Sequence, residues 1–419
     1  MKDKIKNIIK DNKTKIRDLF LSIGATAILN IVIQVALYPF LAKNLGPEKY
    51  GVALSILSLV VILAGTLGTS ANYSRMVSSR NGGIAYTNGD YNVILLSVSL
   101  LCGLGGIFYL RYLGITSAVV ALLFVILVVL SALRYYSDVE FRMKADFVRY
   151  MIYYAAISAG YLLGMLIYKL TGEWMLAIIV GEAFGVLFVV FGGTIYKKDT
   201  FRISKSFGLV CMSLGFLLLS NLIENLTLNA DRLLLMVISG GEEVTIYYTA
   251  SLLGKVVAML SVPINSIIIS YLIKYDGALS KKLWSLASVA ACVIGALAFG
   301  ACTLVSPFLL SILYEEEIYK LALPYIAPAI LGQIFYFISG VLLVILLKFR
   351  GEKMQFLFNL GYAIEFFSIV IVGTLLWGLN GFVCAALAAN AIRFIAVIVW
   401  GFITTRKKSK LKENTQETK

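Results

Sequence analysis

The sequence contains no histidine, and only 14% of its 419 residues are charged. Its five cysteines form no CxxC pair and have no histidine to act with, so the ligand patterns of zinc and haem sites and the Cys–His pair of thiol catalysis are all missing. We therefore expect no bound metal and no cofactor. Soluble domains carry about 25% charged residues, so a chain that is 60% hydrophobic and this poor in charge is predicted to be a membrane protein.

Twelve apolar segments follow one another along the chain, and the gaps between them are too short to hold a folded domain. A helix needs about 20 apolar residues to cross a bilayer, and each segment approaches or exceeds that length. Pro39 and Pro263 are predicted to bend the first and eighth helices, because proline removes a backbone hydrogen bond. The predicted segments are 19–42, 52–72, 93–110, 117–133, 150–168, 174–196, 207–239, 244–273, 283–304, 321–347, 356–377 and 382–403.

Most of the 37 lysines and arginines lie in alternate gaps between these segments. Positive charge in short loops marks the cytoplasmic side of a membrane, so we predict a multi-pass protein of the bacterial cytoplasmic membrane with both termini in the cytoplasm. A pI near 9.4 is also typical of nucleic-acid binding, but here the charge is placed to face lipid headgroups. The predicted organisation is a basic leader (1–18), two six-helix bundles (19–196 and 207–403), a basic linker between them (197–206) and a basic tail (404–419).

An internal repeat relates the two halves. When the sequence is shifted by 195 positions, the first predicted helix falls on the seventh, and both helices run from inside to outside. This arrangement predicts parallel repeats related by an axis along the membrane normal. The matched pairs are Asn30 with Asn225, Gln34 with Asn229, Gly46 with Gly241, and Glu48 with Glu243.

Three motifs, in order along the chain, resemble those of the Wzx-type polysaccharide flippases of bacteria. They are the hairpin sequence at 40–51, the stretch 229–235 followed by 247–250, and the Gly-x-x-Gly-x-x-x-Ala-Ala sequence that begins at Gly378. The resemblance covers essentially the whole chain. It implies the fold of MATE transporters and of the lipid II flippase, with two six-helix bundles around a central cavity. The chain departs from the family before the outer end of the tenth predicted helix, where the family often has glycine and this chain has Glu315–Glu317. The difference reflects either another substrate or a solvated loop.

Polar and charged side chains inside the apolar segments are candidate site residues, because charge in hydrocarbon usually faces a cavity or a partner. The three cations inside the segments, Arg232, Lys255 and Arg393, all belong to the second half. Each candidate also has a purely structural interpretation. The amides could form hydrogen bonds between helices, and Asp231 and Arg232 could form a structural ion pair. We predict substrate binding by Asn30, Gln34, Tyr38, Asn225, Asn229, Arg232, Lys255 and Arg393, and ion coupling by Glu224, Asp231 and Glu365.

These features favour a flippase that carries a polyprenyl-pyrophosphate-linked oligosaccharide across the membrane for lipopolysaccharide or capsule assembly. Amides and tyrosines would replace water around the glycan, and arginine or lysine would hold the phosphates. Titratable carboxylates would couple the cycle to H⁺ or Na⁺. The alternative is a MATE-like exporter of small molecules, although a cavity with several cations is poorly suited to cationic drugs. A membrane enzyme such as a glycan polymerase usually has a large outer loop, which this chain lacks, so we expect no enzyme activity.

Overall fold

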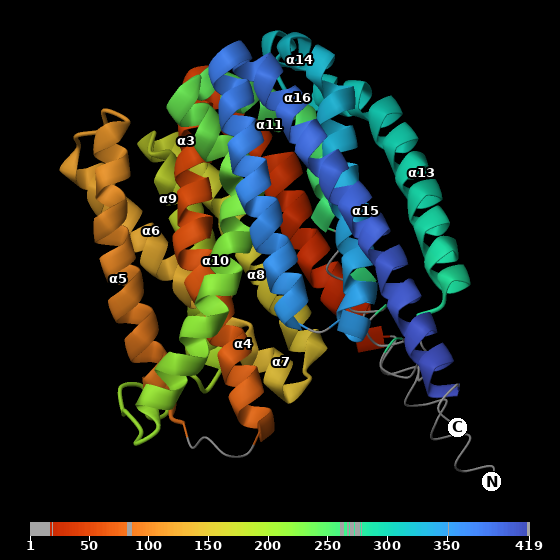
Figure 1. The fold of residues 1–419 in the computed structure, drawn as a ribbon. Helices are drawn as coiled ribbons and strands as arrows, with labels where there is room; N and C mark the ends of the chain where they lie inside the picture. The colour runs from red at the N-terminus through yellow and green to blue at the C-terminus, as the bar shows by residue number, and fades with distance from the viewer. Residues whose placement is uncertain are drawn as a thin grey trace. The chain divides into compact units, whose positions relative to one another are not determined.

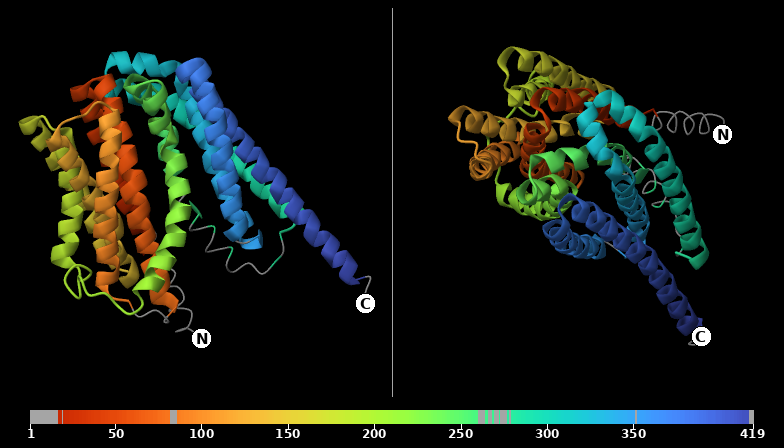
Figure 2. Two further views of the ribbon diagram at one scale, coloured as in Figure 1. Left: turned by 60° about the vertical axis from the view of Figure 1, so that its left-hand side comes forward. Right: turned by 90° about the horizontal axis from the view of Figure 1, so that it is seen from above.

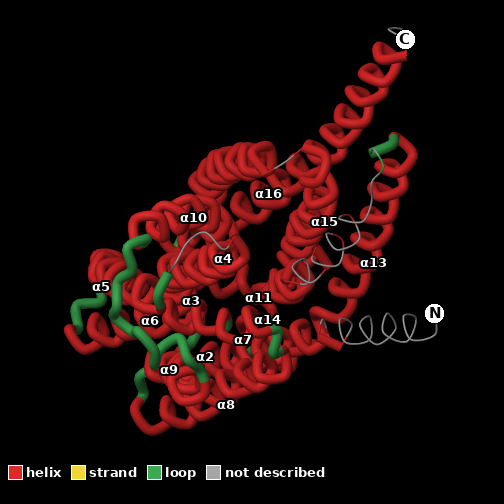
Figure 3. Tube along the Cα trace, turned by 90° about the horizontal axis from the view of Figure 1, so that it is seen from below, coloured by secondary structure: helices red, strands yellow, loops and turns green. Residues whose placement is uncertain are grey.

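The computed structural model describes residues 17–18, 20–81, 86–259, 264–265, 268, 272, 277, 279–350 and 352–416. Within these ranges every regular element is a helix and none is a strand (Figure 3). The prediction of an all-α protein is therefore confirmed. Internal packing divides the chain into two compact units, one from Met1–Gly46 and Ser55–Asn229, the other from Pro47–Leu54 and Ala230–Lys419.

The first unit contains most of the helices of the N-terminal half. Residues 20–31 are helical and continue into a π-helix, η1. Within the unit, α8 packs against α9 and α6 packs against both α5 and α9. The bounds are η1 (Val32–Leu37), α2 (Tyr38–Leu45), η2 (Val61–Gly65), α4 (Thr66–Asn81), α5 (Asn88–Tyr112), α6 (Ala118–Ser137), α7 (Val139–Lys144), α8 (Phe147–Thr171) and α9 (Trp174–Gly192).

The second unit holds the remaining helices, and two long ones have parts in both units. Helix α3 (Pro47–Val60) begins in the second unit and passes into the first, whereas α10 (Phe207–Ile238) leaves the first unit after Asn229. In the second unit α15 packs against α11, α13 and α16. The bounds are α11 (Gly241–Met259), α13 (Lys281–Leu313), α14 (Glu316–Ala322), η3 (Leu323–Tyr325), α15 (Ile326–Arg350) and α16 (Glu352–Gln416) (Figure 1).

Ten helices in the described part of the chain are long and apolar enough to cross a membrane. Nine of them each match one predicted segment, and the tenth, Met354–Thr405, spans the last two predicted segments. The predicted segment 244–273 begins as α11, and most of its C-terminal part lies outside the described residues. Pro263 also lies outside them, so the predicted bend there stays a prediction.

Pro39 follows a local change in the first spanning helix. The backbone N–H of Tyr38 bonds to the carbonyl of Ile33, five residues back, at the end of π-helix η1. Proline has no N–H, and its ring collides with the carbonyl four residues earlier. The wider turns of η1 lie directly before this position. The predicted bend at Pro39 itself stays a prediction.

The last two predicted spans form a helical hairpin within α16. Its helical geometry breaks at Trp377 and at Gly378, whose φ of 56° is a conformation that glycine adopts without strain. The two arms then lie side by side, because Gly373 meets Gly381 and Phe358 stacks on Trp400 (Figure 2). The glycine motif at 378–381 therefore makes the turn between two antiparallel helices.

Close contact between α8 and α9 depends on small residues at their crossing. A side chain at Gly181 would collide with the ring of Tyr161, and one at Gly164 would collide with the backbone of Ala177. The two helices therefore approach closely enough for Glu182, next to Gly181, to reach the Tyr161 hydroxyl. This crossing positions the buried carboxylate of the first unit.

Candidate functional site

Asn221, Asn225 and Asn229 follow one another at four-residue spacing on α10, and the first two donate hydrogen bonds to helix α4. The Asn221 amide donates to the Ser70 hydroxyl at 2.8 Å, and the Asn225 amide donates to the Thr66 hydroxyl at 3.0 Å. Asn229 donates to the carbonyl of Asn225 at 2.9 Å, within its own helix. The amide donors thus contribute to helix packing, which is the interhelical alternative. Substrate binding by Asn225 and Asn229 stays a proposal.

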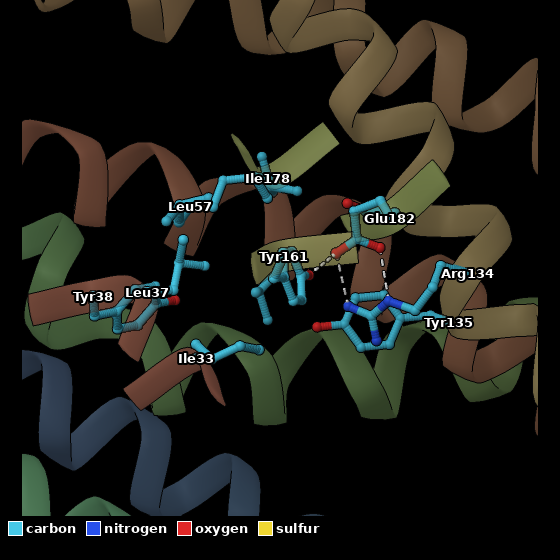
Figure 4. A pocket seen from close by; sticks show the side chains of 12 residues that line it. Ile33, Leu37, Tyr38, Leu57, Arg134, Tyr135, Tyr161, Ile178 and Glu182 are labelled. Atoms are coloured by element: carbon cyan, nitrogen blue, oxygen red, sulfur yellow. Dashed lines mark hydrogen bonds and ion pairs between the residues drawn. The ribbon is translucent and has the colours of Figure 1, made fainter. Parts of the chain in front are cut away.

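The corresponding residues of the first helix have mixed surroundings. Asn30 and Tyr38 are partly exposed, whereas Gln34 is only 6% exposed. Tyr38 lines a cavity of about 70 Å³ that also reaches Arg134 and Glu182 (Figure 4). Of the three, Tyr38 is therefore the one that lines this cavity, on the side opposite the ion pair (Figure 4).

Arg134 and Glu182 form a buried, two-pronged ion pair in the first unit. The Arg134 Nε and Nη2 atoms donate to the two carboxylate oxygens of Glu182 at 2.7 and 3.0 Å, and Tyr161 donates a third bond at 2.6 Å (Figure 4). Arg134 and Glu182 are 8% and 3% exposed. The guanidinium also lies 3.7 Å from the centre of the Tyr135 ring. Charge, geometry and hydrogen bonding are thus satisfied together.

Arg75 and Arg134 follow the predicted segments 52–72 and 117–133, so their side chains were counted among the loop charges, and this placement was wrong. Both are buried in helices, and Arg75 is only 7% exposed. Its guanidinium bonds to Asn88 at 2.6 Å and to the Tyr136 hydroxyl, and it lies near the rings of Tyr86, Tyr91 and Tyr136. The first half therefore has buried cations too, contrary to the expectation that all of them belong to the second half. Their helices extend beyond the apolar runs, and the flanking tyrosines supply the partners.

Asp231 and Lys255 form the corresponding buried ion pair of the second unit. The Lys255 ammonium bonds to the Asp231 carboxylate, and the residues are 8% and 6% exposed, respectively. Lys255 Nζ also lies 4.7 Å from the centre of the Tyr248 ring, and the Arg232 guanidinium lies 4.8 Å from the same centre. One alternative from the sequence was a structural ion pair between Asp231 and Arg232. The structure instead gives Asp231 a partner from the neighbouring helix α11.

Arg393 and Glu365 lie on the two arms of the α16 hairpin. Arg393 is 5% exposed, and its guanidinium lies 4.1 and 4.3 Å from the ring centres of Tyr336 and Tyr362. Glu365 is partly buried. Both residues line one cavity, although substrate binding was predicted for Arg393 and ion coupling for Glu365. Glu224, the third predicted ion-coupling carboxylate, is exposed on α10.

The two hairpins related by the sequence repeat meet inside the second unit. The Glu48 carboxylate accepts hydrogen bonds from the backbone N–H groups of Gly241 and Glu242, at 3.3 and 3.0 Å. Thr245 donates to the carbonyl of Pro47 at 2.6 Å. A carboxylate at this position satisfies free N–H groups and the positive end of α11. The contact ties the beginning of α3 to the beginning of α11.

The acidic sequence Glu315–Glu317 begins the short helix α14. Glu315 is its N-cap, and Glu316 and Glu317 occupy its first turn, where negative charge is favourable. Glu316 pairs with Lys320 at 2.6 Å, with both side chains largely exposed. The acidic residues thus place negative charge at the start of a helix whose first turn is solvent-exposed.

Known structures with the same arrangement of helices are transporters. An inward-facing MATE family transporter of the MOP superfamily is 14% identical, covers 93% of this chain and 99% of its own, and gives a TM-score of 0.67. The lipid II flippase MurJ, in an inward closed conformation, is 12% identical. Its match covers 92% of this chain and 90% of its own, with a TM-score of 0.72. The Vibrio cholerae MATE transporter VcmN, in its bent form, is 13% identical. Its match covers 94% of this chain and 97% of its own, with a TM-score of 0.58.

The fold is that of the MATE transporters and MurJ. The predicted fold relationship is confirmed by these similarities. No protein-family profile matches the sequence, and no curated protein sequence matches it. The narrower assignment to the Wzx type therefore stays a proposal.

Proposed function

We propose that this protein is a flippase that moves a polyprenyl-pyrophosphate-linked oligosaccharide across the bacterial cytoplasmic membrane during surface polysaccharide assembly. The observation that carries the proposal is the set of basic side chains within helices of the second unit: Arg232 on α10, Lys255 on α11 and Arg393 on α16. Lys255 and Arg393 are at least nine-tenths buried. Charges buried at membrane depth are costly and mark substrate or ion pathways, and an anionic pyrophosphate is a substrate that needs such cations.

The three cations differ in their surroundings. Lys255 is paired with Asp231, and Arg393 shares its cavity with Glu365. The Arg232 guanidinium lies against the Tyr248 ring and follows Asp231 directly in the chain. We assign the main pyrophosphate contact to Arg232, because the planar fork of a guanidinium binds phosphate oxygens in pairs. Asn30, Gln34, Tyr38, Asn225 and Asn229 are proposed to meet glycan hydroxyls.

The Asp231–Lys255 pair offers a direct route to ion coupling. A proton or Na⁺ bound at Asp231 would release the Lys255 ammonium for the pyrophosphate. Conversely, a pyrophosphate that captured Lys255 would leave Asp231 open to an ion. Substrate and ion would then each change the affinity for the other, which is thermodynamic linkage. Glu224 and Glu365 remain further candidates for the coupling carboxylate.

The proposed transport mechanism is alternating access, in which the two six-helix halves of the sequence rock and the basic linker 197–206 joins them. The contact of Glu48 with Gly241 and Glu242 supports it, because this contact joins the two repeat-related hairpins at the end that the charge pattern predicts to be external. Opening toward that side would require these hydrogen bonds to break. The contact is therefore proposed to close the outward path.

The alternative is a MATE-like exporter of small molecules, which is supported by the similarity to MATE transporters. Two experiments separate the proposals. Deletion of the gene in its own bacterium should abolish surface glycan and accumulate lipid-linked glycan, without changing resistance to cationic dyes such as ethidium. Normal surface glycan combined with dye sensitivity would instead establish the exporter.

Point variants test the assignment of the phosphate contact. Losing a hydrogen bond to a charged group costs about 1.5–3 kcal/mol, so Arg232→Ala should weaken binding of the pyrophosphate about 10- to 150-fold. We expect Arg232→Lys to restore export only partly, and Lys255→Ala and Arg393→Ala to reduce export at normal protein levels. The matched control is Arg202→Ala, which removes an exposed arginine. Full export by Arg232→Ala would contradict the assignment.

A further inference from the structure

A cavity of about 460 Å³ lies in the second unit, along the two arms of the α16 hairpin. Sites for small molecules usually enclose about 300–1,000 Å³ and combine an apolar lining with a few polar groups. This cavity has that character. Its lining consists of Leu357, Phe358, Gly361, Tyr362, Glu365, Arg393, Ala396 and Trp400.

The cavity is polar at one end and aromatic at the other. Arg393 and Glu365 lie near the middle of their arms, and Phe358 and Trp400 lie seven residues from them along each arm. At 1.5 Å per residue this separation is about 10 Å. Phe358 and Trp400 stack on each other, with ring centres 5.2 Å apart. The stacked pair lies toward the end of α16 that the charge pattern predicts to be cytoplasmic.

Two polar atoms at the polar end of the cavity, away from the Phe358–Trp400 pair, have unmet hydrogen-bonding capacity. Arg393 Nε and Glu365 Oε1 are buried and have no hydrogen-bond partner among the described residues. Arg393 itself is held rigidly, because its guanidinium lies against the Tyr336 and Tyr362 rings and Tyr362 bonds to Asn390 at 2.8 Å. A buried donor or acceptor left unsatisfied costs about 1–3 kcal/mol. The site is thus built to receive a group that both donates and accepts.

We propose that this cavity binds one sugar ring of the transported glycan. A sugar hydroxyl can accept from Arg393 Nε and donate to Glu365 Oε1 at the same time. The polarised C–H bonds on the face of a sugar ring suit the negative face of an aromatic ring, which Tyr362 and Trp400 supply. The proposal rests on the proposed function, since it names the part of that substrate which this cavity holds.

Other occupants fit the same residues less well. The carboxylate of Glu365 opposes a phosphate, because like charges at short range repel. A polyprenyl or acyl chain would fill the apolar end but leave Arg393 Nε and Glu365 Oε1 unsatisfied. A neutral, hydroxylated ring with apolar faces matches both ends of the cavity. Arg393 is accordingly reassigned from the pyrophosphate to the glycan.

Photocrosslinking in the producing bacterium tests the occupant directly. We would place p-benzoylphenylalanine at Leu357, which lines the cavity, or at Ile364, a control residue on the same arm that is 62% exposed and does not line it. Cells would be fed a radiolabelled sugar and then irradiated. The purified protein would be treated with mild acid, which cleaves the bond between the sugar and the pyrophosphate. Label retained at position 357 but not at 364 shows attachment through the glycan.

The other outcomes overturn the proposal. Label that acid removes from position 357 would mean attachment through the polyprenyl chain, and a phospholipid adduct or no labelled adduct there would mean that no sugar ring binds. Failure of the flippase function is recognised separately, by normal surface glycan and no accumulated lipid-linked glycan after gene deletion. If a glycan adduct formed only with the photoprobe at Asn30, the sugar site in this cavity would be rejected but the proposed flippase function would stand.

Variants of Trp400 give a second, independent readout. Trp400→Phe keeps an aromatic face, so crosslinking at Leu357 should fall less than about threefold, whereas Trp400→Leu should lower it roughly tenfold. Glu365→Gln keeps the acceptor oxygen and should retain crosslinking, whereas Glu365→Leu should lose it. Protein levels in the membrane would be measured for each variant. Equal crosslinking in Trp400→Leu and Trp400→Phe would contradict the stacking geometry.

Discussion

Breaking the ion pair between Arg134 and Glu182 by removing one member should destabilise the first unit. Removing one member of a buried ion pair leaves an uncompensated charge and costs about 3–5 kcal/mol. Glu182→Met would leave the Arg134 guanidinium with the Tyr135 ring but without either carboxylate oxygen. Arg134→Met would leave a buried carboxylate with the Tyr161 hydroxyl as its remaining side-chain partner among the described residues.

The double variant should behave differently from either single variant. Replacing a whole buried ion pair with apolar side chains of similar volume is often neutral, or stabilising by about 1–4 kcal/mol. Domains of about 150–250 residues lose about 2–4 °C in Tm for each kcal/mol. Each single Met variant should therefore melt roughly 6–20 °C below the natural protein. The variant that combines Arg134→Met with Glu182→Met should melt above both.

The measurement is thermal unfolding of the purified protein in detergent, followed by loss of the monodisperse peak in size-exclusion chromatography. The control is the same pair of changes at Glu316 and Lys320, a largely exposed ion pair, which should leave the transition unchanged because surface pairs contribute little. If the effects of the two Met changes at 134 and 182 simply add, the residues are not energetically coupled and the reasoning is refuted.

Two further predictions concern topology and the external contact. Reporter fusions after Arg202 and Arg350 should read cytoplasmic and a fusion after Glu316 external; a cytoplasmic signal at Glu316 would overturn the parallel repeat. In a background without the native cysteines, cysteines at Glu48 and Glu242 joined by a short reducible crosslinker should stop glycan export, and reduction should restore it. Export that continues with the pair fully joined would exclude alternating access by this movement.

Much of the fold was predictable because membrane-spanning helices are specified locally. About 20 apolar residues suffice to define a span, and nine predicted segments each match one helix. The turn at Gly378 was visible as a glycine motif, since only glycine enters that backbone conformation without strain. Pro39 directed attention to the same stretch of helix, because proline removes an N–H group wherever it occurs, but the π-helix η1 before it was not predicted.

The site was less predictable, because a side chain's partner comes from another helix. The sequence identified Asn225 as a polar residue inside an apolar segment, but nothing in it indicated that Thr66 would accept the hydrogen bond of this amide. Serine and threonine are common at helix contacts and carry no periodic signal. Arg134 was assigned to a loop because the apolar run ends before it, although α6 continues to Ser137.

The amino-acid sequence by itself determined the class of protein, the positions of most helices, the charge pattern and the identity of the charged residues inside them. Only the tertiary structure decided which charges compensate one another: Arg134 with Glu182, and Lys255 with Asp231. The physical reason is the range of the forces. Burial of an apolar helix depends on its own composition, whereas an ion pair in a low-dielectric interior depends on distances of a few ångströms between helices that are far apart in the sequence.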